Sequence, residues 1–187
     1  MPMSITDICE LFERKGHLAY SGEPVTQLEH ALQSAHLAER AGAPGSLVSA
    51  CFLHDLGHLL NDQGETPTAR GIDDTHQYFA IPFLRGVFGD EVLEPIRLHV
   101  DAKRYLCRAR PDYFAGLSPD SRRSLELQGG IYLQDEADAF IARPHAGAAV
   151  QLRLWDDEAK VAGLDTPSLA HFAVHLRACA LPAGQAA

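Results

Sequence analysis

The chain has 187 residues and a mass of 20.4 kDa, with 46% hydrophobic and 22% charged residues, a composition typical of one folded domain with a real core. Its formal net charge of −9 argues against broad binding to nucleic acid, which needs a surface rich in Lys and Arg. No apolar run is long enough to cross a membrane, and the N-terminus lacks a basic region followed by an apolar one. We therefore expect a cytoplasmic protein that binds neither nucleic acid nor membranes, of unknown oligomeric state.

Helix signals begin at the N-terminus. Ser4, with Asp7 three residues later, predicts a capped helix that ends near Gly16. Pro24 suits the first turn of a second helix, in which apolar residues recur at spacings of three and four until Gly42.

A third helix is predicted from Ser46, as its cap, to Leu60, where the sequence NDQGETPTARG breaks the pattern. The remaining predicted helices cover residues 74–87, 90–99 and 103–110 or begin near Ser118, Pro144 and Thr166. No segment alternates as a strand would, and there is no internal repeat. The predicted fold class is therefore all-α, a compact bundle of about eight or nine helices.

The cysteines are expected to be structural thiols, whereas the histidines are candidate metal ligands. The four cysteines lie far apart with no CxxC spacing, so reduced thiols are expected. Ten histidines are present, several of them within apolar sequence, and imidazole is the commonest metal ligand in proteins.

The stretch ACFLHDLGHLL, residues 50–60, places His54, Asp55 and His58 in an apolar run, where each would cost free energy to bury without a partner. In a helix His54 and His58 would project from one face, with Asp55 at its edge. Taken alone, the motif is equally compatible with core residues satisfied by hydrogen bonds.

Two residues elsewhere extend this set. His30 lies on the preceding predicted helix, which a three- or four-residue connection places antiparallel to the helix of His54. Asp156 lies in RLWDDEAK, where an apolar stretch turns polar. With His54 and Asp55 they make two imidazoles and two carboxylates, a set suited to Fe, Mn, Co or Zn.

These motifs, in their order along the chain, resemble those of a known family. The pattern H…HD…D with its HDLGH core resembles the HD-domain superfamily, helical metalloproteins most of which hydrolyse phosphate esters. The segments YSGEPVTQLEHALQSAHLAERAG, FLHDLGH, HVDAKRYL, SRRSLELQGG and RLWDDEAK together resemble its oxygenase branch, which includes 2-amino-1-hydroxyethylphosphonate dioxygenase and relatives acting on the trimethylammonio analogue. The resemblance covers residues 20–160 of what we expect to be a single HD domain, residues 1–187.

The resemblance implies two iron ions in the mixed-valent Fe(II)/Fe(III) state. One ion would be held by His30, His54, Asp55 and Asp156, and the other by Asp55, His76 and His99. Asp55 would bridge the pair, because a carboxylate has two oxygens and can serve two cations. The alternative for His76 is a solvent-facing helix residue.

The resemblance also implies a phosphonate-binding set: His58, Lys103, Ser121 and Arg153. His99 and Lys103 are four residues apart and Arg153 and Asp156 three apart, so each pair shares a helix face. A planar guanidinium suits a phosphonate well. Gln128, before GG, is a further candidate, whereas the ordinary roles would be a surface lysine for Lys103 and a first-turn helix residue for Ser121.

Tyr20 and Glu23 lie in the turn before the helix of His30. In the family the matching Tyr can bind the vacant iron with the support of the Glu, and both withdraw when substrate arrives. From the residues alone, a Tyr20 packed on the core and a Glu23 stabilising a helix N-terminus would be favoured.

The implied activity is that of a non-heme diiron oxygenase, an oxidoreductase. It would use O2 to cleave the carbon–phosphorus bond of 2-amino-1-hydroxyethylphosphonate or its N-trimethyl analogue, giving phosphate and glycine or glycine betaine. Glu23 favours the unmethylated substrate, whereas an aromatic face from Tyr20, Phe79 or Tyr105 would favour trimethylammonium.

Three alternatives remain open from the sequence. The first is an HD-type metal-dependent phosphohydrolase, which needs only the first four ligands and a metal-bound hydroxide. Inositol oxygenation would use the same diiron core. A catalytically silent helical module is a third alternative, although it would leave many polar groups to satisfy in a small core.

Overall fold

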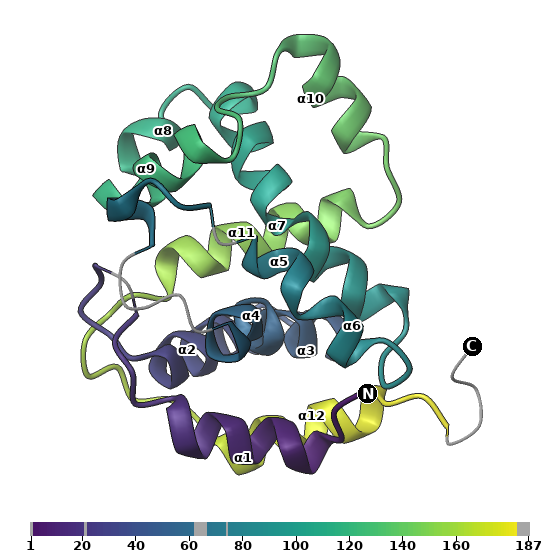
Figure 1. The fold of residues 1–187 in the computed structure, drawn as a ribbon. Helices are drawn as coiled ribbons and strands as arrows, with labels where there is room; N and C mark the ends of the chain where they lie inside the picture. Colours follow the sequence, from purple (N-terminus) through teal and green to yellow (C-terminus); the bar gives the residue numbers. More distant parts are fainter. Residues whose placement is uncertain (1, 21, 62–66, 74, 183–187) are drawn as a thin grey trace.

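The fold is all-α, as seen in a computed structural model that describes residues 2–20, 22–61, 67–73 and 75–182 (Figure 1). Within these ranges the chain forms helices and three isolated β-bridges, without an extended strand. The elements are α1 (Ile5–Lys15), α2 (Gln27–Arg40), α3 (Gly45–Leu53), α4 (Leu56–Leu60), the 3-10 turn η1 (Thr68–Arg70), α5 (His76–Phe79), α6 (Ile81–Leu84), α7 (Asp90–Ala109), α8 (Tyr113–Gly116), α9 (Pro119–Leu127), α10 (Gln134–Ile141), α11 (Ala146–Glu158) and α12 (Leu169–Cys179).

Two predicted helix starts are confirmed by their caps. The Ser4 side chain accepts a hydrogen bond from the backbone N–H of Asp7, whose carboxylate bonds back to the Ser4 N–H as a capping box. Ser118 accepts in the same way from the N–H of Ser121, with Pro119 at the first position of α9.

Other predicted starts are displaced. The Thr26 side chain accepts from the N–H of Glu29 and caps α2, so Pro24 lies in the preceding turn and not in the helix. Ser46 is already inside α3, which begins at Gly45 without a side-chain cap. At α2 the cap is Thr26, two residues after Pro24, and α3 has already begun at Gly45, one residue before Ser46.

The helix predicted from Ser46 to Leu60 is broken in its middle. α3 ends at Leu53 and α4 begins at Leu56. Between them Asp55 has φ −103° and ψ 12°, away from the values of a regular helix. The prediction that His54 and His58 share one face of a continuous helix is therefore wrong.

Several predicted boundaries in the second half also change. α7 is one helix where two were predicted, so the pair four residues apart in it, at 99 and 103, does share a helix. Two short helices, α5 and α6, replace the helix predicted over 74–87, whose first residue lies outside the described ranges. α8 and α10 were not predicted, and α11 and α12 each begin two or three residues after the predicted Pro144 and Thr166.

The middle of the fold is α3, in which every residue from Leu47 to Leu53 is buried. It packs against α2, α7, α11 and α12, and α1 and α12 close one end of the bundle (Figure 1). Several polar side chains are also buried, among them four histidines and two aspartates. They come from the helices that surround α3 and from the break after it, so the fold brings them to one interior location.

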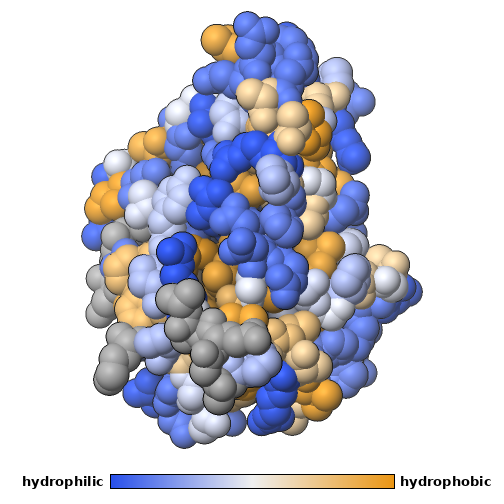
Figure 2. Space-filling view, turned by 90° about the vertical axis from the view of Figure 1, so that its right-hand side faces the viewer, coloured by the Kyte–Doolittle hydropathy of each residue, from blue (hydrophilic) through white to orange (hydrophobic). Residues whose placement is uncertain are grey.

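On the face in Figure 2 hydrophilic residues predominate and apolar ones are scattered. No helix in the described ranges has both the length and the apolar character needed to cross a membrane. All four cysteines lie in those ranges and are free thiols, as predicted.

Candidate functional site

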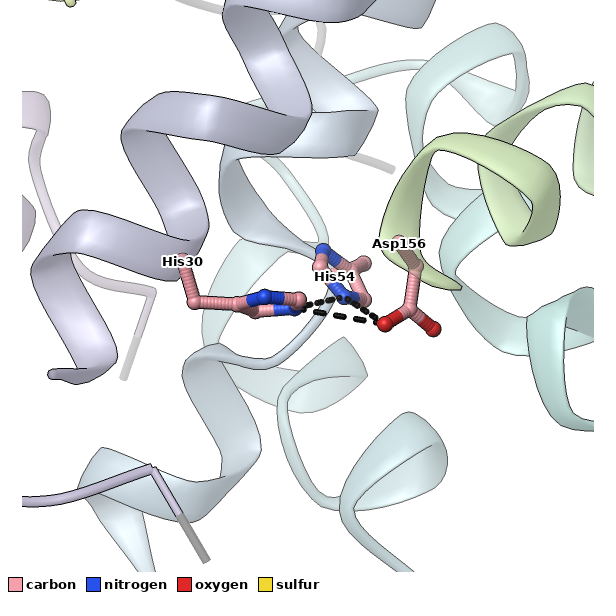
Figure 3. Close-up of side chains that lie close together, drawn as sticks. All are labelled: His30, His54 and Asp156. Atoms are coloured by element: carbon pink, nitrogen blue, oxygen red, sulfur yellow. Dashed lines mark hydrogen bonds and ion pairs between the residues drawn. The ribbon is translucent and has the colours of Figure 1, made fainter. Parts of the chain in front are cut away.

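Three buried side chains from three helices converge in the interior (Figure 3). They are His30 on α2, His54 at the end of α3 and Asp156 on α11. The two Nε2 atoms lie 3.2 Å apart. Asp156 Oδ1 lies 3.3 Å from His30 Nε2 and 3.8 Å from His54 Nε2. Ligands about 2.0–2.1 Å from one tetrahedral ion are separated by roughly 3.4 Å, so the spacing suits a shared metal.

Backbone carbonyls orient both rings. His30 Nδ1 lies 2.8 Å from the oxygen of Ala159, and His54 Nδ1 lies 2.8 Å from the oxygen of Cys51. A carbonyl can only accept, so each Nδ1 donates and each Nε2 is the ring atom available to a metal. Asp156 Oδ1 is buried with no hydrogen-bond partner in the described part of the chain. A metal ion fits these donors, because it would satisfy all three at once.

A second cluster lies beside the first. His76 on α5 and His99 on α7 have their Nε2 atoms 3.0 Å apart, and Asp55 Oδ1 lies 3.3 Å and 3.7 Å from them. The His99 ring donates from Nδ1 to the oxygen of Ile96 at 2.7 Å. Burial and the neighbouring His76 hold the pKa of His99 well below its usual value, which keeps the imidazole neutral for a metal. His76 is buried, which removes its solvent-facing alternative.

Asp55 lies between the two clusters. Its Oδ2 is 3.3 Å from His54 Nε2 and 3.5 Å from His30 Nε2. Its Oδ1 faces His76 and His99 instead. Each oxygen of one carboxylate therefore faces a different pair of histidines, an arrangement that can bridge two cations.

The centre attracts positive charge. Burial disfavours the ionised form of Asp156, but Arg153 holds the pKa of this carboxyl well below its usual range. Burial likewise opposes ionisation of Asp55, whose pKa is nevertheless lowered by His54 and His58. Burial also opposes protonation of His54, yet Asp55 and Asp156 raise its pKa to about 10. A metal ion would supply the positive charge that these carboxylates stabilise.

A cavity of about 230 Å³ opens onto this centre. The seven residues that the sequence suggested for gating and phosphonate binding line it: Tyr20, Glu23, His58, Lys103, Ser121, Gln128 and Arg153. The structure thus gathers around one cavity residues that are up to 133 positions apart in the chain.

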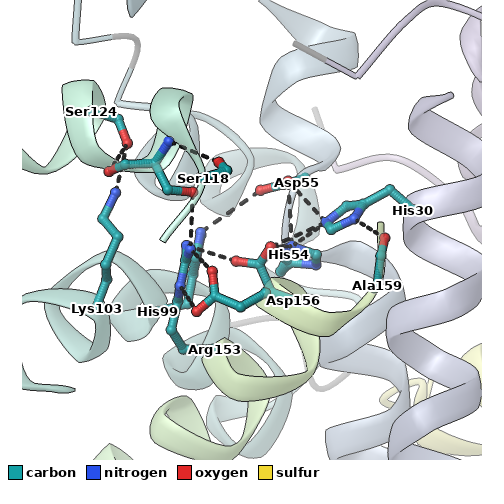
Figure 4. A network of polar contacts seen from close by, with 12 residues as sticks. His30, His54, Asp55, His99, Lys103, Ser118, Ser124, Arg153, Asp156 and Ala159 are labelled. Atoms are coloured by element: carbon teal, nitrogen blue, oxygen red, sulfur yellow. Dashed lines mark hydrogen bonds and ion pairs between the residues drawn. The ribbon is translucent and has the colours of Figure 1, made fainter. Parts of the chain in front are cut away.

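Two buried cations, Lys103 and Arg153, line the cavity, and both are labelled in Figure 4. Lys103 is 2% exposed and donates from Nζ to Ser124 Oγ at 2.7 Å. Burial, with the nearby charge of Arg153, lowers the pKa of Lys103 to about 7. Arg153 pairs with Asp156 Oδ2 at 2.7 Å through Nη1, and its Nη2 lies 3.5 Å from Ser121 Oγ.

Sequence reasoning missed the partners that hold these cations. Arg153 Nε donates to Asp157 Oδ2 at 3.1 Å and to the Tyr113 hydroxyl at 3.2 Å. Tyr113 in turn donates to Asp157 Oδ2. The doubled Asp after RLW was an available signal for Asp157, because residues three and four apart share a helix face. Nothing in the sequence places Tyr113 beside Arg153 or Ser124 beside Lys103.

Tyr20 contacts the candidate ligands directly. Its ring stacks on His30 with centroids 4.0 Å apart, and its hydroxyl donates to Asp55 Oδ2 at 2.7 Å. Glu23 instead lies 3.4 Å from Lys160 Nζ, an atom that is also 5.9 Å from the centre of the Tyr20 ring. Lys160 is a further cavity residue that sequence reasoning did not identify.

The remaining aromatic candidates lie elsewhere. Tyr105 packs on Phe140, with centroids 5.4 Å apart, and Phe79 lies 6.0 Å from Phe83. Of the Phe, Tyr and Trp residues in the described ranges, Tyr20 alone lines the cavity. The suggestion that Phe79 or Tyr105 faces a trimethylammonium group there is therefore wrong.

The chain is similar to known proteins along most of its length, although no family model matches it. It is 44% identical over 176 residues, 94% of this chain and 87% of the relative, to hydroxymethylphosphonate dioxygenase from Gimesia maris. It is 37% identical over 163 residues, 87% of this chain and 83% of the relative, to the glycine-betaine-forming 1-hydroxy-2-(trimethylamino)ethylphosphonate dioxygenase from Leisingera caerulea. Identity at this level over most of both chains shows common descent. The chain belongs to the family of hydroxyalkylphosphonate dioxygenases that these relatives represent.

Proposed function

We propose that this enzyme uses O2 to cleave the carbon–phosphorus bond of a 1-hydroxyalkylphosphonate. The hydroxylated carbon becomes a carboxylate, the phosphorus leaves as phosphate, and both atoms of O2 end in the products. The observation that carries this proposal is the placement of Asp55, whose two oxygens face separate histidine pairs. The names of both relatives support the same reaction class.

Two iron ions are the proposed cofactor, held within a single HD-type domain. His30, His54, Asp156 and Asp55 Oδ2 would hold one ion, and His76, His99 and Asp55 Oδ1 the other. Histidine and carboxylate ligands suit iron, and bound iron would supply the redox chemistry that side chains lack. The protein contributes the ligand geometry, fixed by carbonyl bonds to three of the four rings.

The two buried cations belong to the proposed phosphonate site. Lys103, Arg153 and Ser121 all line the cavity and can donate to different oxygens of one phosphonate, although Arg153 Nη2 also pairs with Asp157 Oδ1. Gln128 Oε1 is buried with no hydrogen-bond partner in the described residues, and after rotation of its amide the NH2 group would donate as well. A phosphonate held here would lie next to the first ligand cluster, because Arg153 also pairs with Asp156.

Three further residues have proposed roles at the cavity. The Tyr20 hydroxyl donates to Asp55 Oδ2, the oxygen proposed to face the first ion, and this position is consistent with a gate supported by Glu23, which pairs with Lys160 beside the Tyr20 ring. His58 stacks on His76 with centroids 4.1 Å apart, and its Nε2 lies 3.8 Å from Asp55 Oδ1. It is therefore the proposed carrier of a proton from the substrate hydroxyl.

The cavity wall favours a substrate without a trimethylammonium group. A quaternary ammonium is best held by several aromatic faces. Among the described residues that line the cavity, Tyr20 is the single Phe, Tyr or Trp. The Glu23 carboxylate already pairs with Lys160. We therefore propose the hydroxymethyl and 2-amino-1-hydroxyethyl phosphonates as better substrates than the trimethylated compound.

The test is aerobic turnover by iron-loaded protein. Hydroxymethylphosphonate, 2-amino-1-hydroxyethylphosphonate and the trimethylated analogue are supplied separately, and O2 uptake and phosphate release are followed together. Equal molar amounts of O2 consumed and phosphate released support the oxygenase. Phosphate release from phosphomonoesters without O2, at comparable efficiency, would overturn it in favour of a phosphohydrolase. A trimethylated compound with the highest kcat/KM contradicts the substrate proposal alone.

A further inference from the structure

We propose that Glu39, His171 and His175 form a second metal site, for a zinc-class divalent ion, on the outside of the bundle. Glu39 lies on α2 and the two histidines on α12. His171 Nε2 and His175 Nε2 lie 2.7 Å and 2.9 Å from the same atom, Glu39 Oε1. Three potential ligand atoms from two helices thus converge within 4.8 Å.

The helix that carries the histidines is fixed on its other side. Phe172 and Leu176 are fully buried, and the Phe172 ring stacks on Phe52 of α3 with centroids 6.1 Å apart. The Ser168 side chain accepts from the N–H of His171 and caps α12. Because this anchoring fixes the rotation of α12, the i and i+4 histidines are directed together towards α2.

The ligand types match those of zinc. Two imidazoles and one carboxylate are a common zinc set, with the fourth position open to water. In a tetrahedral site with bonds of about 2.0–2.1 Å the ligand atoms stand roughly 3.4 Å apart. The present separations need to widen by about half an ångström, which side chains can do without a backbone shift. The side chains of His171, Glu39 and His175 are 44%, 29% and 27% exposed, so an ion can enter from solvent.

A bound ion would join α12 to α2. Glu39 stands nine positions after His30 on the same helix, so the ion would stabilise the helix that carries a ligand of the interior centre. Without metal, the same three residues form only a hydrogen-bonded group, in which the bond from His171 is the main cause of the lowered pKa of Glu39. Metal binding and a simple hydrogen-bonded group therefore predict different responses to zinc.

The experiment uses the iron-loaded holoenzyme titrated with ZnSO4. Bound zinc, retained iron and Tm are measured for the wild type, for Glu39→Gln, for His171→Ala and for His175→Ala. His17→Ala is the matched control, because His17 is an exposed histidine outside this cluster and outside the cavity. The wild type and the control should bind one zinc ion at full iron content with a raised Tm. Each cluster variant should lose about tenfold or more in zinc affinity.

A second readout separates this site from the interior one. Co2+ added to the holoenzyme should give the visible absorption of a tetrahedral site, and His175→Ala should abolish it while O2-dependent turnover stays unchanged. The proposal is overturned if the wild type takes up zinc or cobalt only as iron is lost. It is equally overturned if the three cluster variants bind zinc as the wild type does.

Discussion

The two oxygens of Asp55 face two different histidine pairs, and the first prediction tests whether both oxygens are needed. An Asn side chain has one oxygen and an NH2 group, so Asp55→Asn cannot contact both clusters as a ligand. We expect iron content to fall below two per chain and O2-dependent turnover to fall by at least about 100-fold, at the upper end of losses seen when the surroundings of a metal are altered. Iron analysis and electron paramagnetic resonance of the proposed mixed-valent iron pair provide the measurement.

Asp156→Asn is the matched control for that substitution. Asp156 lies near His30 and His54 but not near the second histidine pair, so its loss should weaken one ion selectively. A variant Asp55→Asn that keeps two iron ions and the wild-type resonance signal would show that Asp55 does not bridge.

Lys103 gives a pH prediction, because burial lowers its pKa to about 7 from 10.5. Below pH 7 the side chain is a cation that attracts phosphonate, and above pH 7 the free enzyme progressively loses that charge. Since kcat/KM reports the free enzyme, the ratio of wild-type to Lys103→Met kcat/KM should be largest near pH 6 and fall above pH 7. The ratio removes the ionisation of the substrate, which both proteins share. A ratio that stays flat from pH 6 to pH 9 would contradict this role.

At the scale of elements, the contact between α4 and α5 is unusually close. A Cβ added to Gly57 would lie 2.2 Å from the backbone oxygen of His76. Gly57→Ala should therefore push α5 and its histidine away from Asp55, lower the free energy of unfolding by about 1–3 kcal/mol, and reduce the iron content. Thermal unfolding and iron analysis on the same sample test both effects.

Gly147→Ala serves as the control for this substitution. Gly147 is exposed in α11, and an added Cβ would meet no atom within 4 Å. Alanine is the better helix former, so the substitution should be neutral or stabilise by up to about 1 kcal/mol with unchanged iron. Equal effects of the two substitutions would refute a special role for the α4–α5 contact.

The break between α3 and α4 is a helix boundary that could not be predicted from the sequence. Leu53 and Leu56 are fully buried on either side of it, so the apolar pattern continues across the break and predicts one helix. Asp55 in the break faces the interior clusters, and most of their members come from other helices, so no local pattern predicts this position. The caps at Ser4 and Ser118 were predictable because each depends on residues three positions away.

At the scale of the whole molecule, chelation is the informative perturbation. The clusters lie where α2, α3, α5, α7 and α11 meet, and an ion that binds only the folded chain stabilises it by about 2.7 kcal/mol at 100 times its Kd. For a protein of this size that corresponds to roughly 5–10 °C in Tm. Calorimetry with and without excess chelator should show at least this difference. An unchanged Tm after complete iron removal would mean that the clusters do not bind the ions as proposed.

Fold class was predictable for the whole molecule, but the composition of the cavity was only partly so. Helical periodicity and the absence of strand patterns are properties of the sequence alone, and they predict an all-α bundle. The bond between Lys103 and Ser124, 21 positions apart on different helices, depends on how α7 and α9 pack. No local pattern encodes that packing, and for this reason Ser124, Tyr113 and Lys160 were not identified before the structure.

Carbonyl oxygens of the main chain hold the rings of His30, His54 and His99. A main-chain oxygen is present whatever amino acid occupies its position, so point mutations in the neighbouring side chains leave these three bonds chemically intact. The proposed phosphonate site, by contrast, consists of side chains from α7, α9 and α11. Substitutions of these side chains can therefore change the substrate preference, while the main-chain bonds that orient the imidazoles are preserved.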